Sequence, residues 1–249
     1  MDCQRHQDEI HRNRLLWQKK AILRQIYGDF HLRMARHLSH LRQGLTVELG
    51  SGMGNIKQVV PDCIRTDLFA NPWIDQVENA YRLSFAPSSV ANLLLMDVFH
   101  HLQFPGDALD EFHRVLMPGG RIIILEPCLS LLGLIVYGGC HPEPLGLMKT
   151  IQWHAPTEDH QDSKCYYAAQ GNASRIFSRP SFQHLLTKWR PIKSERFAAI
   201  AYILSGGYSK PQLLPDRALR FIAATEAILD TMPRLFATRY LVVLQKKAV

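Results

Sequence analysis

The 249-residue sequence lacks the features of a secreted, disulfide-bonded or membrane-spanning protein. Its five cysteines include no Cys-x-x-Cys pair, and an odd, scattered set does not suit a secreted disulfide framework. The polar start, Met1 to His6, lacks the apolar stretch of a signal peptide. The longest apolar segment, Leu129 to Tyr137, is far shorter than the ~18 residues that a membrane span needs. We therefore expect a cytoplasmic protein that does not span a membrane.

The basic charge of the sequence is concentrated at its two ends. Lys and Arg number 29 against 22 Asp and Glu, a net charge of +7. Residues 1–43 and 205–249 carry this excess, whereas the middle of the chain is close to neutral. Basic ends occur in proteins that bind nucleic acid, anionic lipid or phosphorylated substrates, so charge alone does not choose among these partners.

The pattern of apolar residues indicates an α/β protein, and 47% hydrophobic residues are enough for a large core. Helical periodicity covers residues 8–43, with a break at Gly28-Asp29, and then 107–116, 181–189 and 216–232. Short apolar strands are predicted at 45–49, 63–67, 92–97, 121–125, 200–204 and 240–244, with a turn at 117–120. Alternating strands and helices predict a mostly parallel sheet with helices on both faces.

Two segments stand apart from this pattern. Residues 1–43 read as an N-terminal helical cap on a main domain at 44–249. Residues 127–180 are irregular and too long for a plain loop, so we expect an insert or lid on the substrate side. Within it, Leu129 to Tyr137 is predicted to be buried in the core, with contact at a membrane surface as the alternative.

A glycine loop after the first strand indicates the class of cofactor. The loop reads Val47-Glu-Leu-Gly-Ser-Gly-Met-Gly54, with an acidic residue two positions before its first glycine. A dinucleotide fingerprint, G-x-G-x-x-G, would need glycine at position 55, which is Asn. The loop instead resembles motif I of class I S-adenosylmethionine-dependent methyltransferases.

Later motifs strengthen this resemblance and follow in the same order. Asp67 ends the second strand, where a carboxylate can accept hydrogen bonds from ribose hydroxyls. The stretches Asp97 to Leu102 and Arg114 to Pro127 resemble small-molecule methyltransferases of the ubiquinone and menaquinone biosynthesis type. The resemblance covers Leu45 to Pro127. It implies a Rossmann-like fold with a mostly parallel seven-stranded sheet, and S-adenosyl-L-methionine as the cofactor.

The resemblance also implies a set of cofactor-binding residues. Carried over, this set is Glu48, Gly50, Ser51, Gly52, Gly54, Asp67, Leu68, Asn79, Ala80 and Asp97. The glycines would wrap the methionine part, Asp67 would hold the ribose, and Asn79-Ala80 would replace the family's Asp-Ala at the adenine edge. A second departure is the short distance from Gly54 to Pro61, which leaves under two turns for the first helix and weakens its dipole.

Histidines near the end of the fourth strand are the candidate catalytic residues. His100 and His101 could take a proton from the acceptor, or one of them could cap the following loop. His141 and Glu143 in the insert are the candidate wall of the acceptor site. We predict no metal site, because His141 and Glu143 alone lack a third ligand. Trp153, His154, Glu158, Asp159 and His160 suit a solvated loop.

Three functions remain open. The first is methylation of a small-molecule acceptor, which could be lipid-linked, saccharide or quinone-like. The second is RNA methylation, with the basic N-terminal residues Arg12, Arg14, Lys19, Lys20 and Arg24 tracking phosphates. The third is nucleoside binding without turnover. No Asp/Asn-Pro-Pro-Tyr/Phe motif of base-amino methyltransferases follows the fourth strand, and we expect Cys128 to be a buried thiol. The sequence leaves the oligomeric state open.

Overall fold

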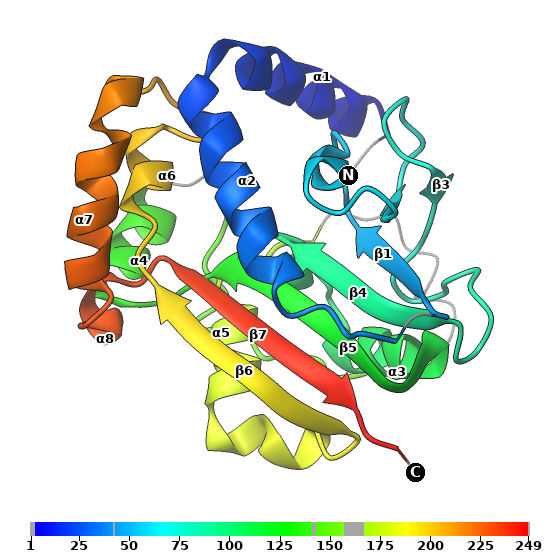
Figure 1. Ribbon diagram of the computed structural model, residues 1–249. Coiled ribbons are helices and arrows are strands. Elements are labelled where there is room, and N and C mark those ends of the chain that lie inside the picture. The colour runs from blue at the N-terminus through cyan, green and yellow to red at the C-terminus, as the bar shows by residue number, and fades with distance from the viewer. Residues whose placement is uncertain (1–2, 42, 141–142, 157–166, 249) are drawn as a thin grey trace.

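A seven-stranded sheet forms the centre of the protein (Figure 1). The computed structural model describes residues 3–41, 43–140, 143–156 and 167–248. The strands are β1 (Leu45–Leu49), β2 (Ile64–Asp67), β3 (Gln76–Val77), β4 (Val90–Met96), β5 (Leu116–Pro127), β6 (Trp189–Phe197) and β7 (Arg239–Lys246). Their order is β3-β2-β1-β4-β5-β7-β6, with β7 antiparallel to both of its neighbours and the other pairs parallel. The predicted mostly parallel sheet is confirmed.

Helices cover both faces of this sheet. They are α1 (Cys3–Lys19), α2 (Ala21–Ala35), α3 (Pro105–Val115), α4 (Leu131–Ile135), α5 (Asn172–Ser178), α6 (Ile200–Leu204), α7 (Leu219–Leu229) and α8 (Pro233–Phe236). Short 3-10 turns are η1 (Asn55–Gln58), η2 (Phe99–His101), η5 (Pro180–Leu185) and η6 (Asp216–Ala218), and η3 (Val136–Cys140) is a π turn. None of the described helices is long and apolar enough to cross a membrane.

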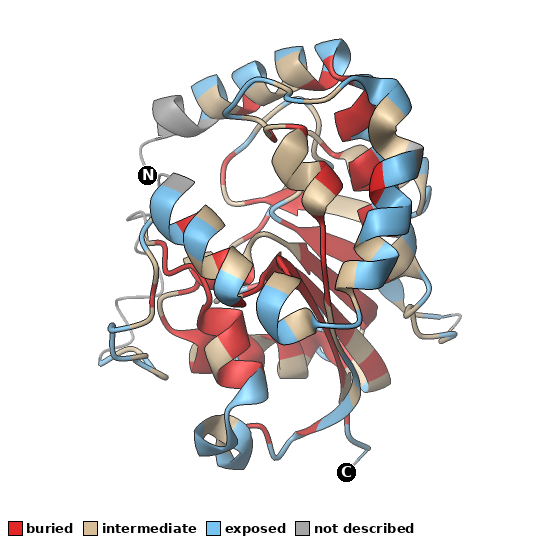
Figure 2. Cartoon of the chain, turned by 90° about the vertical axis from the view of Figure 1, so that its left-hand side faces the viewer, coloured by how far each residue is buried: buried red, intermediate tan, exposed pale blue. Residues whose placement is uncertain are grey.

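Alternation along the central strands divides the core into two layers. On one face, Leu93 and Leu95 pack with Phe112 of α3. On the other, Leu94 packs with Phe30 of α2. Strand residues alternate in direction, so a strand with apolar residues at every position is buried on both faces. Figure 2 shows this buried sheet between helices whose outer surfaces are exposed.

The N-terminal helical segment breaks at Lys20, so the predicted break at Gly28-Asp29 is wrong. Lys20 has extended backbone angles, φ −104° and ψ 97°, between α1 and α2. Its buried ammonium donates to the carbonyls of Ser205, Gly207 and Lys210, at 2.9, 2.7 and 2.7 Å. The break therefore serves a long-range contact, which local propensity does not reveal. Gly28 lies inside α2.

The C-terminal part of the chain corrects two further expectations. Residues 200–204 form α6 rather than a strand. The helix expected at 181–189 is shorter, because η5 ends at Leu185. Trp189 begins the strand β6, which was not predicted. β6 is an edge strand with many exposed polar residues, so it lacks the apolar run of a central strand.

The turn expected at 117–120 lies within β5 as an interruption of its pairing. Leu116 pairs with Val90, and Arg121 pairs with Asn92, so the residues between them bulge from the ladder. Gly119 has φ +78°, a conformation that favours glycine.

The apolar segment 129–137 is only partly buried, so its assignment to the core is half correct. Tyr137 is 4% exposed and donates a hydrogen bond to the Thr238 carbonyl at 2.7 Å. Leu131 and Ile135 on α4 are 59% and 61% exposed.

Candidate functional site

The glycine loop after β1 forms an open cradle at the carboxyl edge of the sheet. Gly50, Gly52 and Gly54 have φ of +68°, +52° and +68°. A Cβ on Gly50 would lie 2.4 Å from the Val98 side chain, so glycine lets the loop approach the segment after β4. A Cβ on Gly52 would meet nothing within 4 Å. This space beside the backbone could receive a ligand. The loop leads into η1, a single 3-10 turn, as its short distance to Pro61 suggested.

Asp67 holds the glycine loop from the end of β2. One carboxylate oxygen accepts a hydrogen bond from the Gly52 amide at 2.9 Å, and the other accepts from the Leu68 amide at 2.7 Å. The residue is 5% exposed. A carboxylate oxygen can accept more than one hydrogen bond, so an oxygen that holds a backbone amide can also accept from a ribose hydroxyl. Asp67 and Leu68 therefore lie where the sequence places a nucleoside contact.

Ser51 and Glu48 connect the glycine loop to its surroundings. The Ser51 hydroxyl accepts from the Thr66 amide at 3.2 Å and donates to the Glu48 carbonyl at 3.3 Å. The Glu48 carboxylate lies 3.7 Å from Nε2 of His31 on α2. Burial raises the pKa of Glu48 to about 7, although a hydrogen bond with Ser51 acts to lower it. Burial also lowers the pKa of His31 to about 4. Glu48 thus links the glycine loop to the N-terminal helices.

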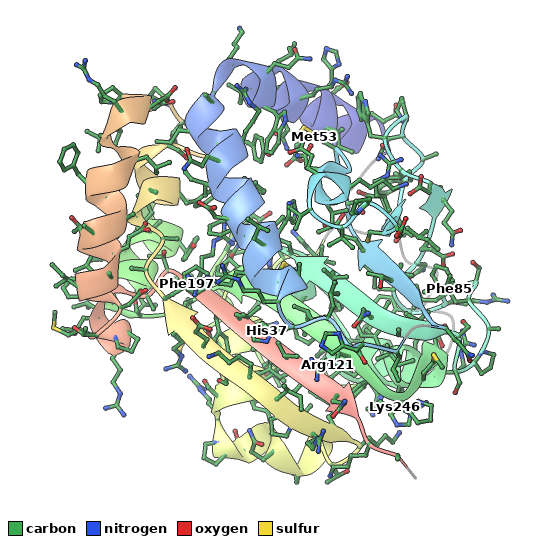
Figure 3. All side chains as sticks on the ribbon, viewed as in Figure 1. His37, Met53, Phe85, Arg121, Phe197 and Lys246 are labelled. Atoms are coloured by element: carbon green, nitrogen blue, oxygen red, sulfur yellow. The ribbon has the colours of Figure 1, made fainter. Side chains whose placement is uncertain are left out.

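Met53 extends this link on the loop itself. Its side chain lies beneath α1 (Figure 3) and packs against an aromatic cluster that includes Trp17 and Tyr27. The N-terminal helices therefore support the glycine loop directly.

Asn79 and Ala80 lie on a turn that a neighbouring carboxylate shapes. Asn79 Oδ1 accepts from the Tyr81 amide at 3.0 Å, and Ala80 packs against the core. Buried Glu78 accepts hydrogen bonds from the Ser84 amide at 2.8 Å and from the Ser84 hydroxyl. Glu78 was not among the predicted site residues, although it directly precedes Asn79 in the sequence.

The histidine pair lies on η2, and Glu126 at the end of β5 holds His100 in position. Glu126 is fully buried, and its oxygens accept from the Phe99 amide at 2.6 Å and contact His100 Nδ1 at 2.6 Å. Because β4 and β5 are parallel neighbours, their carboxyl ends meet at one edge of the sheet. That adjacency was the signal for Glu126, which the sequence analysis did not assign to the site.

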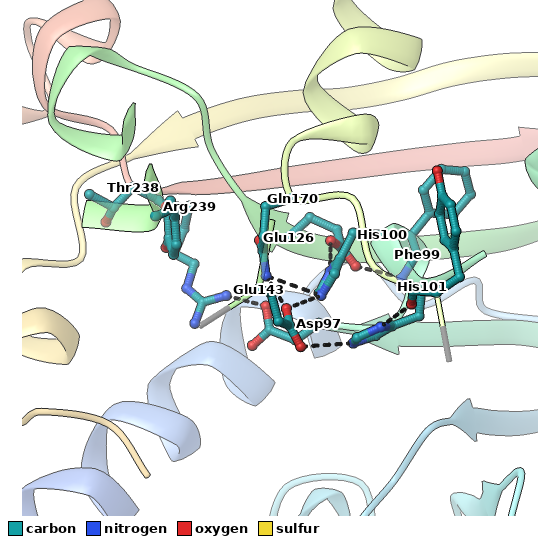
Figure 4. Close-up of polar contacts among 11 residues, drawn as sticks. Asp97, Phe99, His100, His101, Glu126, Glu143, Gln170, Thr238 and Arg239 are labelled. Atoms are coloured by element: carbon teal, nitrogen blue, oxygen red, sulfur yellow. Dashed lines mark hydrogen bonds and ion pairs between the residues drawn. The ribbon is translucent and has the colours of Figure 1, made fainter. Parts of the chain in front are cut away.

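The insert adds two side chains to the histidine pair. Glu143 Oε2 lies 3.2 Å from His100 Nε2, and Glu143 Oε1 lies 3.7 Å from His101 Nε2. Buried Gln170 donates to Glu143 and lies 3.2 Å from His100 Nε2. His101 Nδ1 donates to the Tyr167 carbonyl at 2.9 Å. Figure 4 shows these side chains converging; we call His100, His101, Glu143 and Gln170 the acceptor cluster.

Backbone hydrogen bonds attach the insert to η2. The Ala169 amide donates to the His100 carbonyl at 3.0 Å, and the Gln170 amide donates to the Pro144 carbonyl at 3.0 Å. The Gly146 amide donates to the Gln170 carbonyl at 2.9 Å. The two described parts of the insert are thus hydrogen-bonded to each other and to η2, next to the acceptor cluster.

The environment separates the two histidines. Although burial opposes protonation, the neighbouring carboxylates of Glu126 and Glu143 raise the pKa of His100 to about 10. Burial and the adjacent His100 charge lower the pKa of His101 to about 4. His100 is therefore cationic at neutral pH and His101 is neutral.

Asp97 forms an ion pair with Arg239 at the start of β7 (Figure 4). Asp97 has φ +57°, and Arg239 is 2% exposed with its guanidinium 4.5 Å from the centre of the Tyr202 ring. The pair joins the ends of β4 and β7 beside the acceptor cluster. Arg239 was not among the predicted site residues, because β7 follows β4 by more than a hundred positions.

Other predicted site residues lie elsewhere. His141 and residues 158–160 fall outside the described residues. His154 contacts Asp107 at 2.6 Å, on the side of α3. Cys128 is a buried thiol, as expected, and burial raises its pKa to about 11. Of the basic N-terminal residues, Lys20 is buried, Arg24 donates to the Trp17 and Gln18 carbonyls, and the Arg14 guanidinium stacks over Trp73.

Comparison with known proteins identifies the domain that carries this site. Residues 48–124 match the family model described as a methyltransferase domain. This part of the chain is similar to a methyltransferase domain.

Solved structures show the same fold at low sequence identity. A methyltransferase of Thermotoga maritima is 12% identical to this chain, with a TM-score of 0.54. The alignment covers 98% of this chain and 100% of that one. The methyltransferase in complex with the Trm112 activator of Haloferax volcanii shares 14% identity with a TM-score of 0.50, over 88% of this chain and 90% of that one. The [4+2]-cyclase SpnF has the same identity and TM-score, over 89% and 81%. No curated protein sequence matches the chain.

Proposed function

We propose that the protein is an S-adenosylmethionine-dependent methyltransferase and that its small-molecule acceptor binds between η2 and the insert. The observation that carries the proposal is the joint construction of the acceptor cluster. His100 and His101 come from the end of β4, and Glu143 and Gln170 come from the insert that is hydrogen-bonded to it. Because the insert lies in direct contact with the histidines, the site suits a compact acceptor better than a polynucleotide.

The glycine loop and Asp67 fit the cofactor. The open space beside Gly52 offers a cradle, and the Asp67 carboxylate beside it is a hydrogen-bond acceptor suited to ribose hydroxyls. We propose that Gly50, Ser51, Gly52 and Gly54 hold the methionine part, with Asp67 and Leu68 at the ribose and Asn79 with Ala80 at the adenine. Glu48 and Asp97 then fix the loop and the end of β4.

S-adenosylmethionine supplies an electrophilic methyl group, so this chain must chiefly align the acceptor and receive its proton. Gly50 lies close to Val98, the residue before η2, which supports a cofactor site next to the acceptor cluster. We propose that the acceptor cluster receives the proton of the acceptor. His141, two residues before Glu143, stays a predicted part of the acceptor wall.

An apolar surface at the start of the insert favours an acceptor with an apolar part. Exposed Leu131 and Ile135 on α4 adjoin α8, whose Leu235 is 42% exposed. A quinone-like or lipid-linked acceptor of the ubiquinone and menaquinone type would match such a surface. A saccharide would gain less from it.

Methyl-labelled S-adenosylmethionine, incubated with the protein and a host extract, tests the proposal. The label is then divided among RNA, protein, solvent-extractable lipid and small solutes. We expect it in the lipid or small-solute fraction. Label that ribonuclease removes would contradict the small-molecule proposal, and cofactor binding without any labelled product would favour a binding protein.

A further inference from the structure

The acceptor cluster contains three side chains with the composition of a metal site. His100, His101 and Glu143 each offer one ligand atom, and these atoms lie within 4.8 Å of one another. Two imidazoles and one carboxylate are a ligand set that holds catalytic Zn²⁺ in other enzymes and leaves a coordination position open. Although the sequence predicts no metal site, we propose that His100, His101 and Glu143 bind a divalent transition-metal cation of the Zn²⁺ type.

The outer contacts of both histidines support this assignment. A carbonyl oxygen only accepts hydrogen bonds, so the contact with Tyr167 places a proton on His101 Nδ1. Glu126 lies against Nδ1 of His100 in the same way, at 2.6 Å. In both rings Nε2 is then the nitrogen that faces Glu143. Metal-binding histidines are oriented by this kind of contact, from a carboxylate or carbonyl to the second ring nitrogen.

Gln170 gives an independent indication. Its side chain is 2% exposed, and its Oε1 has no hydrogen-bond partner in the part of the chain that the structure describes. Its Nε2 faces His100 Nε2 and Glu143. Rotation of the amide by a half turn would exchange the two atoms and place Oε1 beside the histidines, where it could serve as a further oxygen ligand.

The charges of the site also fit a dication. The carboxylates of Glu126 and Glu143 contact the two ends of one imidazole ring, that of His100. Glu126 is 0% exposed, and the positive charge of the nearby Arg239 is directed to Asp97. A bound cation would displace the proton from Nε2 of His100, and the two carboxylates with neutral imidazoles would then carry two negative charges, which a divalent cation balances.

The role of the cation toward the acceptor rests on the proposed function. A metal bound by three protein ligands has room for an acceptor oxygen, whose proton it makes easier to remove. Metal binding itself needs no acceptor. It can therefore be measured separately from methyl transfer.

The test uses full-length protein without a histidine tag, treated with a chelator and then titrated with Co²⁺. We expect one Co²⁺ per chain with the ligand-field absorption of a nitrogen- and oxygen-bound ion, displaced by Zn²⁺. Zn²⁺ should also raise the melting temperature, because it binds the folded state. Glu143→Gln and His101→Gln should lose both effects. Glu126→Gln should weaken Co²⁺ affinity by roughly 10–100-fold.

His154→Gln is the matched control, because His154 pairs with Asp107 outside the cluster. It should bind Co²⁺ like the wild type. Circular dichroism verifies that each variant is folded, and His101, with a side chain 34% exposed, is the position most tolerant of change. Absence of stoichiometric binding, or binding unchanged in both ligand variants, would overturn the metal site. Methyl transfer that persists after such a result would leave the proposed function intact.

Discussion

At the scale of single residues, Asp67 connects the proposed ribose contact to the shape of the glycine loop. Its carboxylate accepts from the Gly52 amide, so its loss would remove the proposed ribose acceptor and also loosen the loop. We expect Asp67→Ala to weaken binding of S-adenosylhomocysteine by roughly 1–3 kcal/mol, measured by titration calorimetry. Asp62→Ala, at an exposed position before β2, is the control. Equal affinity of the two variants would remove Asp67 from the cofactor site.

The buried pair of Glu48 and His31 should make stability depend on pH in opposite directions. The raised pKa of Glu48, about 7 against an ordinary 4.5, means that only the folded chain keeps this proton between these values, so stability falls as pH rises. The lowered pKa of His31, about 4 against 6.5, means that the unfolded chain binds the extra proton, so stability rises with pH.

Single substitutions separate these two contributions. Glu48→Gln should make the free energy of unfolding rise more steeply than in the wild type from pH 4 to 6.5. His31→Gln should make it fall relative to the wild type from pH 4.5 to 7. Urea unfolding across this range measures both slopes. Slopes that are unchanged in both variants, or that change in the reverse directions, would show that the pair is ionised in the folded protein.

At the scale of elements, Lys20 joins the break between α1 and α2 to the turn after α6. Without its ammonium, three carbonyls in a buried position lose their donor. We expect Lys20→Met to lower the free energy of unfolding by roughly 1–3 kcal/mol, measured in urea. Lys19→Met, at the exposed neighbouring residue, should change it little. Similar losses in both variants would contradict the anchoring role of Lys20.

The elements also show how far sequence reasoning reaches. The sequence pattern predicted β1, β2, β4 and α3. Their apolar residues recur with the period of a strand or helix because these elements pack in the central sheet or against it. β6 was missed because it lies at the sheet edge, and α6 was mistaken for a strand because five apolar residues fit either structure. The break at Lys20 depends on partners 185 to 190 positions away.

The candidate site divides in the same way. Gly50, Asp67 and the histidine pair follow strands in the sequence, so their positions were predictable. The meeting of His100 with Glu143 was not, because it depends on how the insert folds back over η2. Pairing of the insert with itself and with η2 is a tertiary arrangement that leaves no periodic signal.

At the scale of the whole molecule, two of the basic N-terminal residues are engaged within the fold. Lys20 is buried and Arg24 is bound to carbonyls of α1. We expect binding to a mixed-sequence RNA to be weak and to change little with salt, measured by fluorescence anisotropy from low to physiological salt. A steep decrease in affinity with salt would indicate several phosphate contacts and support an RNA acceptor.

The central claim is that methyl transfer takes place at the acceptor cluster, beside but separate from the cofactor cradle. The most direct measurement compares the methyl-transfer rate of Glu143→Gln with that of the wild type, on the acceptor fraction that takes up label. S-adenosylhomocysteine affinity is measured on the same preparations. We predict a rate lowered by about 10²-fold or more, as expected for loss of proton transfer, with cofactor affinity nearly unchanged. A wild-type rate in Glu143→Gln would contradict the account.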